Sequence, residues 1–106
     1  MMFNTGSSLL DAVVLAVVAR EQEGTYGYRI TQDVRNVIDV SESALYPVLR
    51  RLQTNSLLET YDKEFSGRNR RYYKITAQGM IELDSYRRDW IEYYKKMNSI
   101  LLGDDL

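Results

Sequence analysis

The sequence predicts an α+β fold that is mainly α-helical, with three helices, then a β-hairpin, then a long closing helix. Three observations support this prediction. Apolar residues recur at helical spacing in the first half, two short Tyr-rich segments flank a Gly-containing loop, and a heptad pattern of apolar residues ends the chain. At 106 residues the chain is long enough for one domain and too short for two independent cores.

The first helix is expected from Leu9 to Arg20, where nearly every residue is apolar. Periodicity does not separate a buried helix from a buried strand in such a run, but the length of the run favours a helix. A second, amphipathic helix is expected over residues 26–37, because Ile30, Val34 and Val37 follow helical spacing. These two helices would supply much of a small core.

The third helix is expected to run to about Thr54. Proline in a helix interior costs about 3 kcal/mol, so Pro47 indicates either that this helix begins near Ser43 or that it is kinked. Residues 57–65 and 70–75 then change to strand composition, and the intervening "SGRN" is typical of a hairpin loop. Two adjacent tyrosines in the second strand must face opposite sides of it, and we expect Tyr73 to be the inward one.

The last helix is expected to begin after Thr76, which can cap it. Its apolar side chains are spaced 3, 4, 3, 4, 3, which is the a/d pattern of a coiled-coil seam. Three short helices and a hairpin are too small to cover this stripe, so we expect it to meet a second copy of the chain in a homodimer. The stripe consists of Leu83, Tyr86, Trp90, Tyr93, Met97 and Ile100.

The composition argues against most kinds of catalytic or metal site. The chain has no cysteine and no histidine, and therefore lacks the commonest metal ligands, the commonest general base and the thiol nucleophile. We expect no cofactor, no metal and no enzymatic activity. The first apolar run is interrupted by Asp11 and is far shorter than the roughly 20 residues that span a bilayer, so we expect a cytoplasmic protein with no membrane partner.

The charge distribution favours a nucleic-acid partner. The chain as a whole has a net charge of −1, yet residues 50–74 have a net charge of +4, while the segments before and after them are acidic. This segregation is typical of a DNA-binding protein, because phosphate contacts supply much of the affinity. Together with the element order, it predicts a winged helix-turn-helix over residues 1–75 and a dimerisation helix over residues 76–106, within one compact domain.

Other interpretations remain open at this stage. In the first, Arg70, Arg71 and Lys74 only solvate a strand face and pair with Asp62 and Glu64 across the hairpin. In the second, the chain is a dimeric adaptor that binds another protein, which would explain the heptad stripe but not the basic third helix and hairpin. An enzyme that uses carboxylates of the last helix has the least support, because acids on a long helix usually form a solvated face.

Four stretches of the chain resemble the PadR family of bacterial transcriptional regulators. They are "YGYRITQDV", "SESALYPVLRRL", "GRNRRYYKIT" and "TAQGMIEL", and they follow in the family's order and spacing within residues 9–101. The resemblance implies the small subfamily with a single C-terminal helix, whose members are homodimeric repressors of a palindromic operator in double-stranded DNA. Pro47 belongs to the family's "LYP" pattern, which removes the reason to move the start of the third helix.

The resemblance and the charge pattern together select the candidate DNA-binding residues. They are Tyr26, Ser43, Ala44, Tyr46, Pro47, Arg50, Arg51, Arg68, Asn69, Arg70 and Arg71. One departure from the family is the turn after the recognition helix, where a glycine is usual and this chain has Asn55 and Ser56. Because asparagine tolerates left-handed backbone angles, we expect the turn to be kept.

Small members of the family often respond to aromatic or drug-like molecules, and the resemblance places Trp90 in the corresponding pocket at a dimer interface. A small aromatic effector would then meet Ala12, Ala16, Tyr86, Trp90, Tyr93 and Tyr94. The alternative is that these aromatic residues only pack the dimer interface. The sequence leaves both possibilities open.

Overall fold

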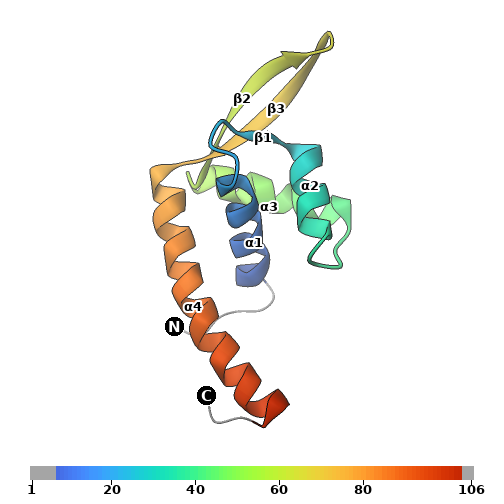
Figure 1. The fold of residues 1–106 in the computed structure, drawn as a ribbon. Helices are drawn as coiled ribbons and strands as arrows, with labels where there is room; N and C mark the ends of the chain where they lie inside the picture. Colours follow the sequence, from blue (N-terminus) through green and yellow to red (C-terminus); the bar gives the residue numbers. More distant parts are fainter. Residues whose placement is uncertain (1–6, 104–106) are drawn as a thin grey trace.

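A computed structural model describes residues 7–103 of the chain and confirms the mainly helical α+β fold. Helices α1, α2 and α3 cluster together, the β2–β3 hairpin projects from this cluster, and α4 runs along one side and extends beyond it (Figure 1). The elements in chain order are α1 (Ser7–Ala19), β1 (Thr25–Tyr26), α2 (Gly27–Arg35), α3 (Glu42–Thr54), β2 (Leu58–Phe65), β3 (Arg68–Ile75) and α4 (Ala77–Leu102).

The core lies between α1 and the elements packed around it. Val14, Leu15 and Val18 of α1 are fully buried, and burying one such side chain contributes about 1.5–3 kcal/mol. The apolar positions of α2, α3, the hairpin base and the start of α4 close over them. The buried partners are Ile30, Val34, Leu45, Val48, Leu49, Leu52, Leu57, Leu58, Tyr73 and Leu83.

The segment before α2 differs from the prediction. Tyr26 was expected at the start of a helix, but with φ −95° and ψ 160° it is extended and lies just before α2. Thr25 and Tyr26 form β1, which pairs with β3 and gives an antiparallel sheet of order β1-β3-β2. Two residues are too few to show an alternating pattern, so this strand has no sequence signal. Helix α2 also ends earlier than expected, and Val37 beyond it is 69% exposed.

Helix α3 begins at Glu42, where the side chain of Ser41 accepts a hydrogen bond from the amide of Ala44 at 3.3 Å. Pro47 lies inside the helix on its exposed side. The turn after α3 is kept, but not through Asn55, whose φ is −85°. Ser56 takes the left-handed conformation instead, with φ 63°.

The hairpin is tighter than predicted. Ser66 and Gly67 alone form the turn, with φ 52° and 79°, which matches the mirror-image turns that suit the twist of hairpin strands. Phe65 pairs with Arg68 directly across it. Arg68 and Asn69 are therefore strand residues and not part of the loop. Tyr73 faces the core as predicted and is 8% exposed.

Helix α4 starts as predicted, with the Thr76 side chain accepting from the amide of Gly79 at 2.9 Å. Its apolar stripe leaves the core as it proceeds, because Leu83 is 2% exposed, Trp90 43% and Ile100 77%. Within residues 7–103, none of the helices combines the length and apolar character needed to cross a bilayer. The second half of α4 thus carries exposed apolar side chains among charged and polar ones.

Candidate functional site

Residues from four elements line a groove of about 440 Å³ beside the hairpin. Helix α3 contributes Tyr46, β3 contributes Arg70 and Arg71 above the buried Tyr73, and the remaining residues come from β1 and the first turn of α2. The lining residues from β1 and α2 are Tyr26, Gly27 and Tyr28. The structure therefore brings four of the candidate residues, Tyr26, Tyr46, Arg70 and Arg71, to one place.

Arg70 is held between two aromatic rings. Its guanidinium carbon lies 4.5 Å from the ring centre of Tyr26 and 4.3 Å from that of Phe65. A planar guanidinium stacks well on aromatic faces. The two rings therefore hold the Arg70 guanidinium in one orientation. Sequence reasoning missed Phe65, although its place next to the turn puts it diagonally across the hairpin from Arg70 on the same face.

Arg71 points to the opposite side of the strand and meets an acid. Its Nε lies 3.8 Å from Oδ1 of Asp62, and both side chains are about 60% exposed. An exposed pair of this kind contributes roughly 0–1 kcal/mol, so it can be exchanged for another anion at little cost. One alternative was that the basic hairpin residues only solvate a strand face and pair with acids. Arg71 fits this alternative, because it pairs with Asp62. Arg70 does not, because it stacks on two aromatic rings.

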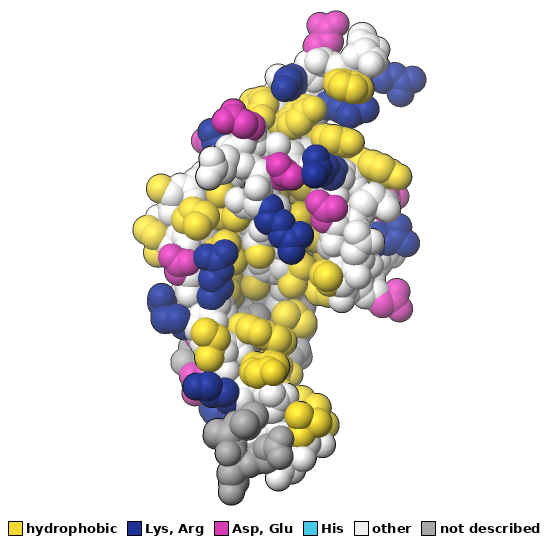
Figure 2. Space-filling view, viewed as in Figure 1, with side chains coloured by type: hydrophobic (Ala, Val, Ile, Leu, Met, Phe, Trp, Pro, Cys, Tyr) yellow, Lys and Arg dark blue, Asp and Glu magenta, His cyan; other side chains and the backbone are white. Residues whose placement is uncertain are grey.

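Three tyrosine rings of the sheet contact one another, two from the hairpin and one from β1. Tyr61 and Tyr72 lie with ring centres 5.4 Å apart and nearly parallel, and Tyr26 meets Tyr72 edge-on at 5.7 Å. The Tyr61 hydroxyl donates to the carbonyl oxygen of Glu23 in the turn after α1. Basic, acidic and hydrophobic side chains cover this end of the molecule (Figure 2). The ring contacts join the hairpin to the helical cluster and fix its angle.

Helix α3 exposes the face on which the other candidates lie. Ser43, Ala44, Pro47 and Arg50 are exposed, and Tyr46 is 43% exposed. Burial raises the pKa of the Tyr73 hydroxyl above its ordinary value, and among the smaller effects are those of Tyr46, which raises it, and Arg50, which lowers it. Arg50 is thus close enough to the groove to act on it electrostatically.

Arg68 and Asn69 are exposed next to the turn, beyond the groove.

Arg51 lies apart from the other candidate residues. Neighbouring side chains on a helix project about 100° apart, so Arg51 points away from Arg50 and toward α1. There it donates to the carboxylate of Asp11 in an ion pair. The sequence placed the two arginines together because both belong to the basic segment, and adjacency in sequence hides their different directions.

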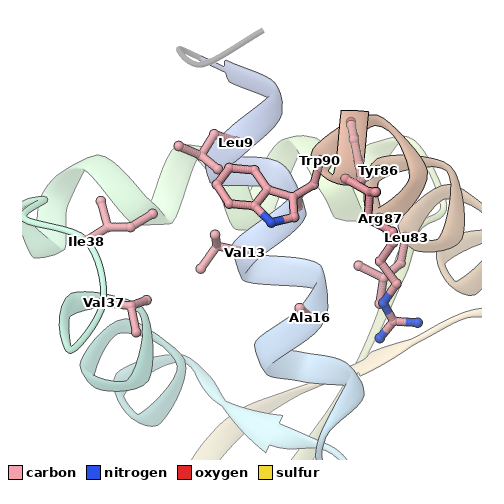
Figure 3. A pocket seen from close by; sticks show the side chains of 11 residues that line it. Leu9, Val13, Ala16, Val37, Ile38, Leu83, Tyr86, Arg87 and Trp90 are labelled. Carbon is pink, nitrogen blue, oxygen red and sulfur yellow. The ribbon is translucent and has the colours of Figure 1, made fainter. Parts of the chain in front are cut away.

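A second candidate site is an apolar hollow of about 700 Å³ between α1, α4 and the loop after α2. The indole of Trp90 projects from α4 toward Leu9 and Val13 of α1, with Val37 and Ile38 on the other side (Figure 3). Among residues 7–103, Arg87 is the one charged residue that lines the hollow, and its Nη1 lies 3.0 Å from Oδ1 of Asp84. The lining of the hollow therefore suits an apolar molecule that contains an aromatic ring.

The hollow contains most of the predicted effector residues. Ala12, Ala16, Tyr86 and Trp90 line it, whereas Tyr93 and Tyr94 do not. Their rings lie 5.9 and 6.2 Å from the ring of Trp90, farther along α4. Sequence reasoning missed Val37 and Ile38, because nothing in the sequence shows that the loop after α2 folds back toward α1.

Comparisons with known proteins identify a family of transcriptional regulators. The model of the transcriptional regulator PadR-like family matches residues 14–85. An uncharacterized protein of Lysinibacillus sphaericus is 32% identical over 99 residues, covering 89% of each chain. A transcriptional regulator of Mycobacterium tuberculosis is 38% identical over 64 residues, covering 59% of this chain and 60% of that one.

Solved structures give the same result. A protein of Streptococcus mutans superimposes with a TM-score of 0.85 at 31% identity, covering 100% of this chain and 98% of that one. A PadR-like transcriptional regulator of Bacillus cereus has a TM-score of 0.80 at 30% identity, covering 91% and 94%. A PadR family regulator of Clostridium difficile has a TM-score of 0.78 at 27% identity, covering 87% and 97%.

Proposed function

The chain belongs to the PadR-like family of transcriptional regulators, which bind DNA and are not enzymes, and from this premise we propose that it is a homodimeric repressor of a palindromic operator. The observation that carries the proposal is the convergence of Tyr26, Tyr46 and Arg70 on one groove beside the exposed face of α3. No side chain caps the start of α2 within this groove. Free amides at a helix start bind phosphate well.

In this proposal α3 enters the major groove. Arg50 pairs with a guanine edge or a phosphate, Tyr46 reaches a phosphate or a thymine methyl group, and Ser43, Ala44 and Pro47 lie along the same exposed face. The hairpin lies beside the helix as a wing, and Arg68 at its tip enters the minor groove. Arg70 is held between the rings of Tyr26 and Phe65 and points toward the DNA backbone before binding. Its side chain therefore loses little conformational freedom when the complex forms.

Titration of a labelled fragment from upstream of the protein's own gene, at several salt concentrations, tests this proposal. We expect salt-dependent binding, with Arg50→Gln and Arg70→Gln each weakening it and the loss of a phosphate contact lowering the salt slope by about one. Arg88→Gln on the exposed surface of α4 is the matched control and should leave binding unchanged. Binding with no sequence preference even at low salt would contradict the proposal.

We further propose that a small aromatic molecule occupies the apolar hollow and releases the repressor from DNA. The support is the size of the hollow, its apolar lining and the projecting indole of Trp90. Because Trp90 is the single tryptophan of the chain, its emission reports directly on the hollow. A panel of planar aromatic compounds should include members that quench it saturably; no quenching across the panel would mean that the hollow only packs against the partner subunit.

A further inference from the structure

An ion pair connects the hollow to the recognition helix. Asp11 of α1 accepts from Arg51 of α3, and its side chain is 13% exposed. This is the least exposed carboxylate in the ion pairs of residues 7–103, since the others are between 33% and 61% exposed. The carboxylate of this pair is therefore screened less by salt than those of the other pairs, while Arg51 remains 44% exposed.

Asp11 is next in sequence to a residue of the hollow, although its own side chain turns to Arg51. It precedes Ala12, which lines the hollow from α1, while Tyr86 lines the hollow from α4. Burial raises the pKa of the Tyr86 hydroxyl, the negative charge of Asp11 raises it further, and Arg51 lowers it. The phenol of Tyr86 thus lies within the electrostatic reach of both members of the pair.

On the other side, the pair acts on the helix that carries the DNA-binding face. Arg51 follows Arg50 directly and lies in the same helix as Tyr46. Val14 of α1 and Leu49 of α3 belong to the common apolar core. The ion pair adds to this packing a directional contact between the two helices, because its geometry depends on where Asp11 and Arg51 lie.

We propose that Asp11 and Arg51 are positioning residues that transmit occupancy of the hollow to the recognition helix. A ring inserted beside Tyr86 shifts α4 against α1, this shift changes the geometry of the ion pair, and α3 moves with Arg51, so that Arg50 and Tyr46 no longer fit the operator. The inference rests on the proposed function, since it needs both an operator and an occupant of the hollow. Linkage then requires that operator binding weakens binding in the hollow by the same factor.

The test measures this reciprocal coupling on the full-length protein. Anilinonaphthalene sulfonate serves as the probe, because its anionic group keeps it off DNA and its emission rises in apolar surroundings. Its displacement by a compound that quenches Trp90 assigns the bound probe to the hollow. The measured quantity is the ratio of its dissociation constants with and without saturating operator. We expect a ratio of at least about five for the unmodified protein, as in typical allosteric coupling, and a ratio below about two for Asp11→Asn.

Two further variants make the result specific. Arg51→Gln breaks the pair from the other side, and the double variant should lose no more coupling than either single one, because both substitutions remove one interaction. Glu21→Gln is the matched control: it also replaces a carboxylate that pairs with an arginine, Arg29 at 2.9 Å, but it lies away from the hollow. It should keep the full ratio.

The outcomes distinguish a failure of the inference from a failure of the proposed function. A full ratio in both Asp11→Asn and Arg51→Gln overturns the inference and leaves the repressor and the hollow intact. A ratio near one in the unmodified protein, with both ligands binding, also overturns it. If the unmodified protein fails to bind the operator fragment, the proposed repressor function is wrong and the inference falls with it. If it binds the operator but not the probe, the inference is overturned and the repressor function stands.

Discussion

The Thr76 side chain joins the end of the recognition helix to the start of α4. Its hydroxyl donates to the backbone carbonyl oxygen of Ser56 at 2.7 Å, and the same Oγ1 accepts from the amide of Gly79 at 2.9 Å. The amide of Thr76 also donates to the carbonyl oxygen of Leu57 at 3.1 Å. The hydrogen bonds of this one residue therefore restrain the direction in which α4 leaves the end of β3.

Replacing Thr76 by valine keeps its shape and removes both hydroxyl bonds. We expect the free energy of unfolding to fall by about 1–2 kcal/mol, the usual cost of a lost helix cap, as measured by urea denaturation. Thr76→Ser retains the hydroxyl and should keep most of the stability. Equal stability of the valine variant and the unmodified protein would show that water replaces the hydroxyl without loss.

Gly79 lies in the same junction and has no room for a side chain. A Cβ atom there would lie 2.2 Å from the carbonyl oxygen of Leu57 and 2.7 Å from Cγ1 of Ile75. Because one of these neighbours is backbone, Gly79→Ala should destabilise the protein by about 2–3 kcal/mol, as overpacking does. Thermal unfolding measures this loss. Gln78→Ala, at the exposed preceding position, is the control and should change the stability little.

Ser56 occupies the left-handed position that a glycine would hold more easily. Its amide donates to the carbonyl oxygen of Gln53, and the amide of Leu57 donates to that of Leu52 at 2.9 Å, which is the hydrogen-bond pattern of a helix end that prefers glycine. Ser56→Gly should therefore stabilise the protein by about 1 kcal/mol. Asn55→Gly, at a residue with φ −85°, should stabilise it no further and can be measured in the same denaturation experiment.

This turn also shows where sequence reasoning reaches its limit. The sequence predicted that the turn survives without glycine, but it assigned the left-handed angle to Asn55 because asparagine tolerates that angle best. The position in the helix-end motif decides instead, and only Ser56 occupies it. In the same way, strand β1 is defined by its pairing with Tyr72 and Tyr73 and not by its own two residues.

Longer patterns were predicted better because many residues contribute to them. The long helices, the cap at Thr76 and the inward direction of Tyr73 follow from periodicity and capping chemistry that the sequence displays directly. The hollow was predicted only in part, since the α1 and α4 residues Ala12, Ala16, Tyr86 and Trp90 lie on regular helices, whereas its other wall is a loop. The direction of Arg51 depends on a tertiary contact with Asp11, which no local pattern shows.

Tyr73 predicts how stability changes at alkaline pH. Burial raises the pKa of its hydroxyl in the folded state above the ordinary value of 10.0. A raised folded-state pKa means that this contribution to stability is complete below about pH 10 and is lost as pH rises through the folded pKa. Tyr73→Phe should therefore lose less stability than the unmodified protein between about pH 9 and about pH 11, as measured by urea denaturation at each pH. Tyr94→Phe, at a position that is 51% exposed, should behave like the unmodified protein.

The far end of α4 predicts the oligomeric state. On the heptad stripe, Trp90 is 43% and Ile100 77% exposed, and an exposed apolar stripe at heptad spacing is stabilised by a second helix. We expect sedimentation equilibrium to give the mass of a dimer. Ile100→Glu should raise the dimer dissociation constant at least about tenfold, which corresponds to about 1.4 kcal/mol, because two carboxylates would enter one apolar seam.

Ser99→Glu is the matched control for this variant. It adds the same charge one residue earlier, about 100° around the helix and off the stripe, where Ser99 is exposed. It should leave the dimer intact. Because a palindromic operator needs two recognition helices, Ile100→Glu should also weaken binding to the full operator while leaving the weaker binding to a half-site unchanged. A monomeric unmodified protein, or equal weakening by both substitutions, would show that this stripe is not the dimer seam.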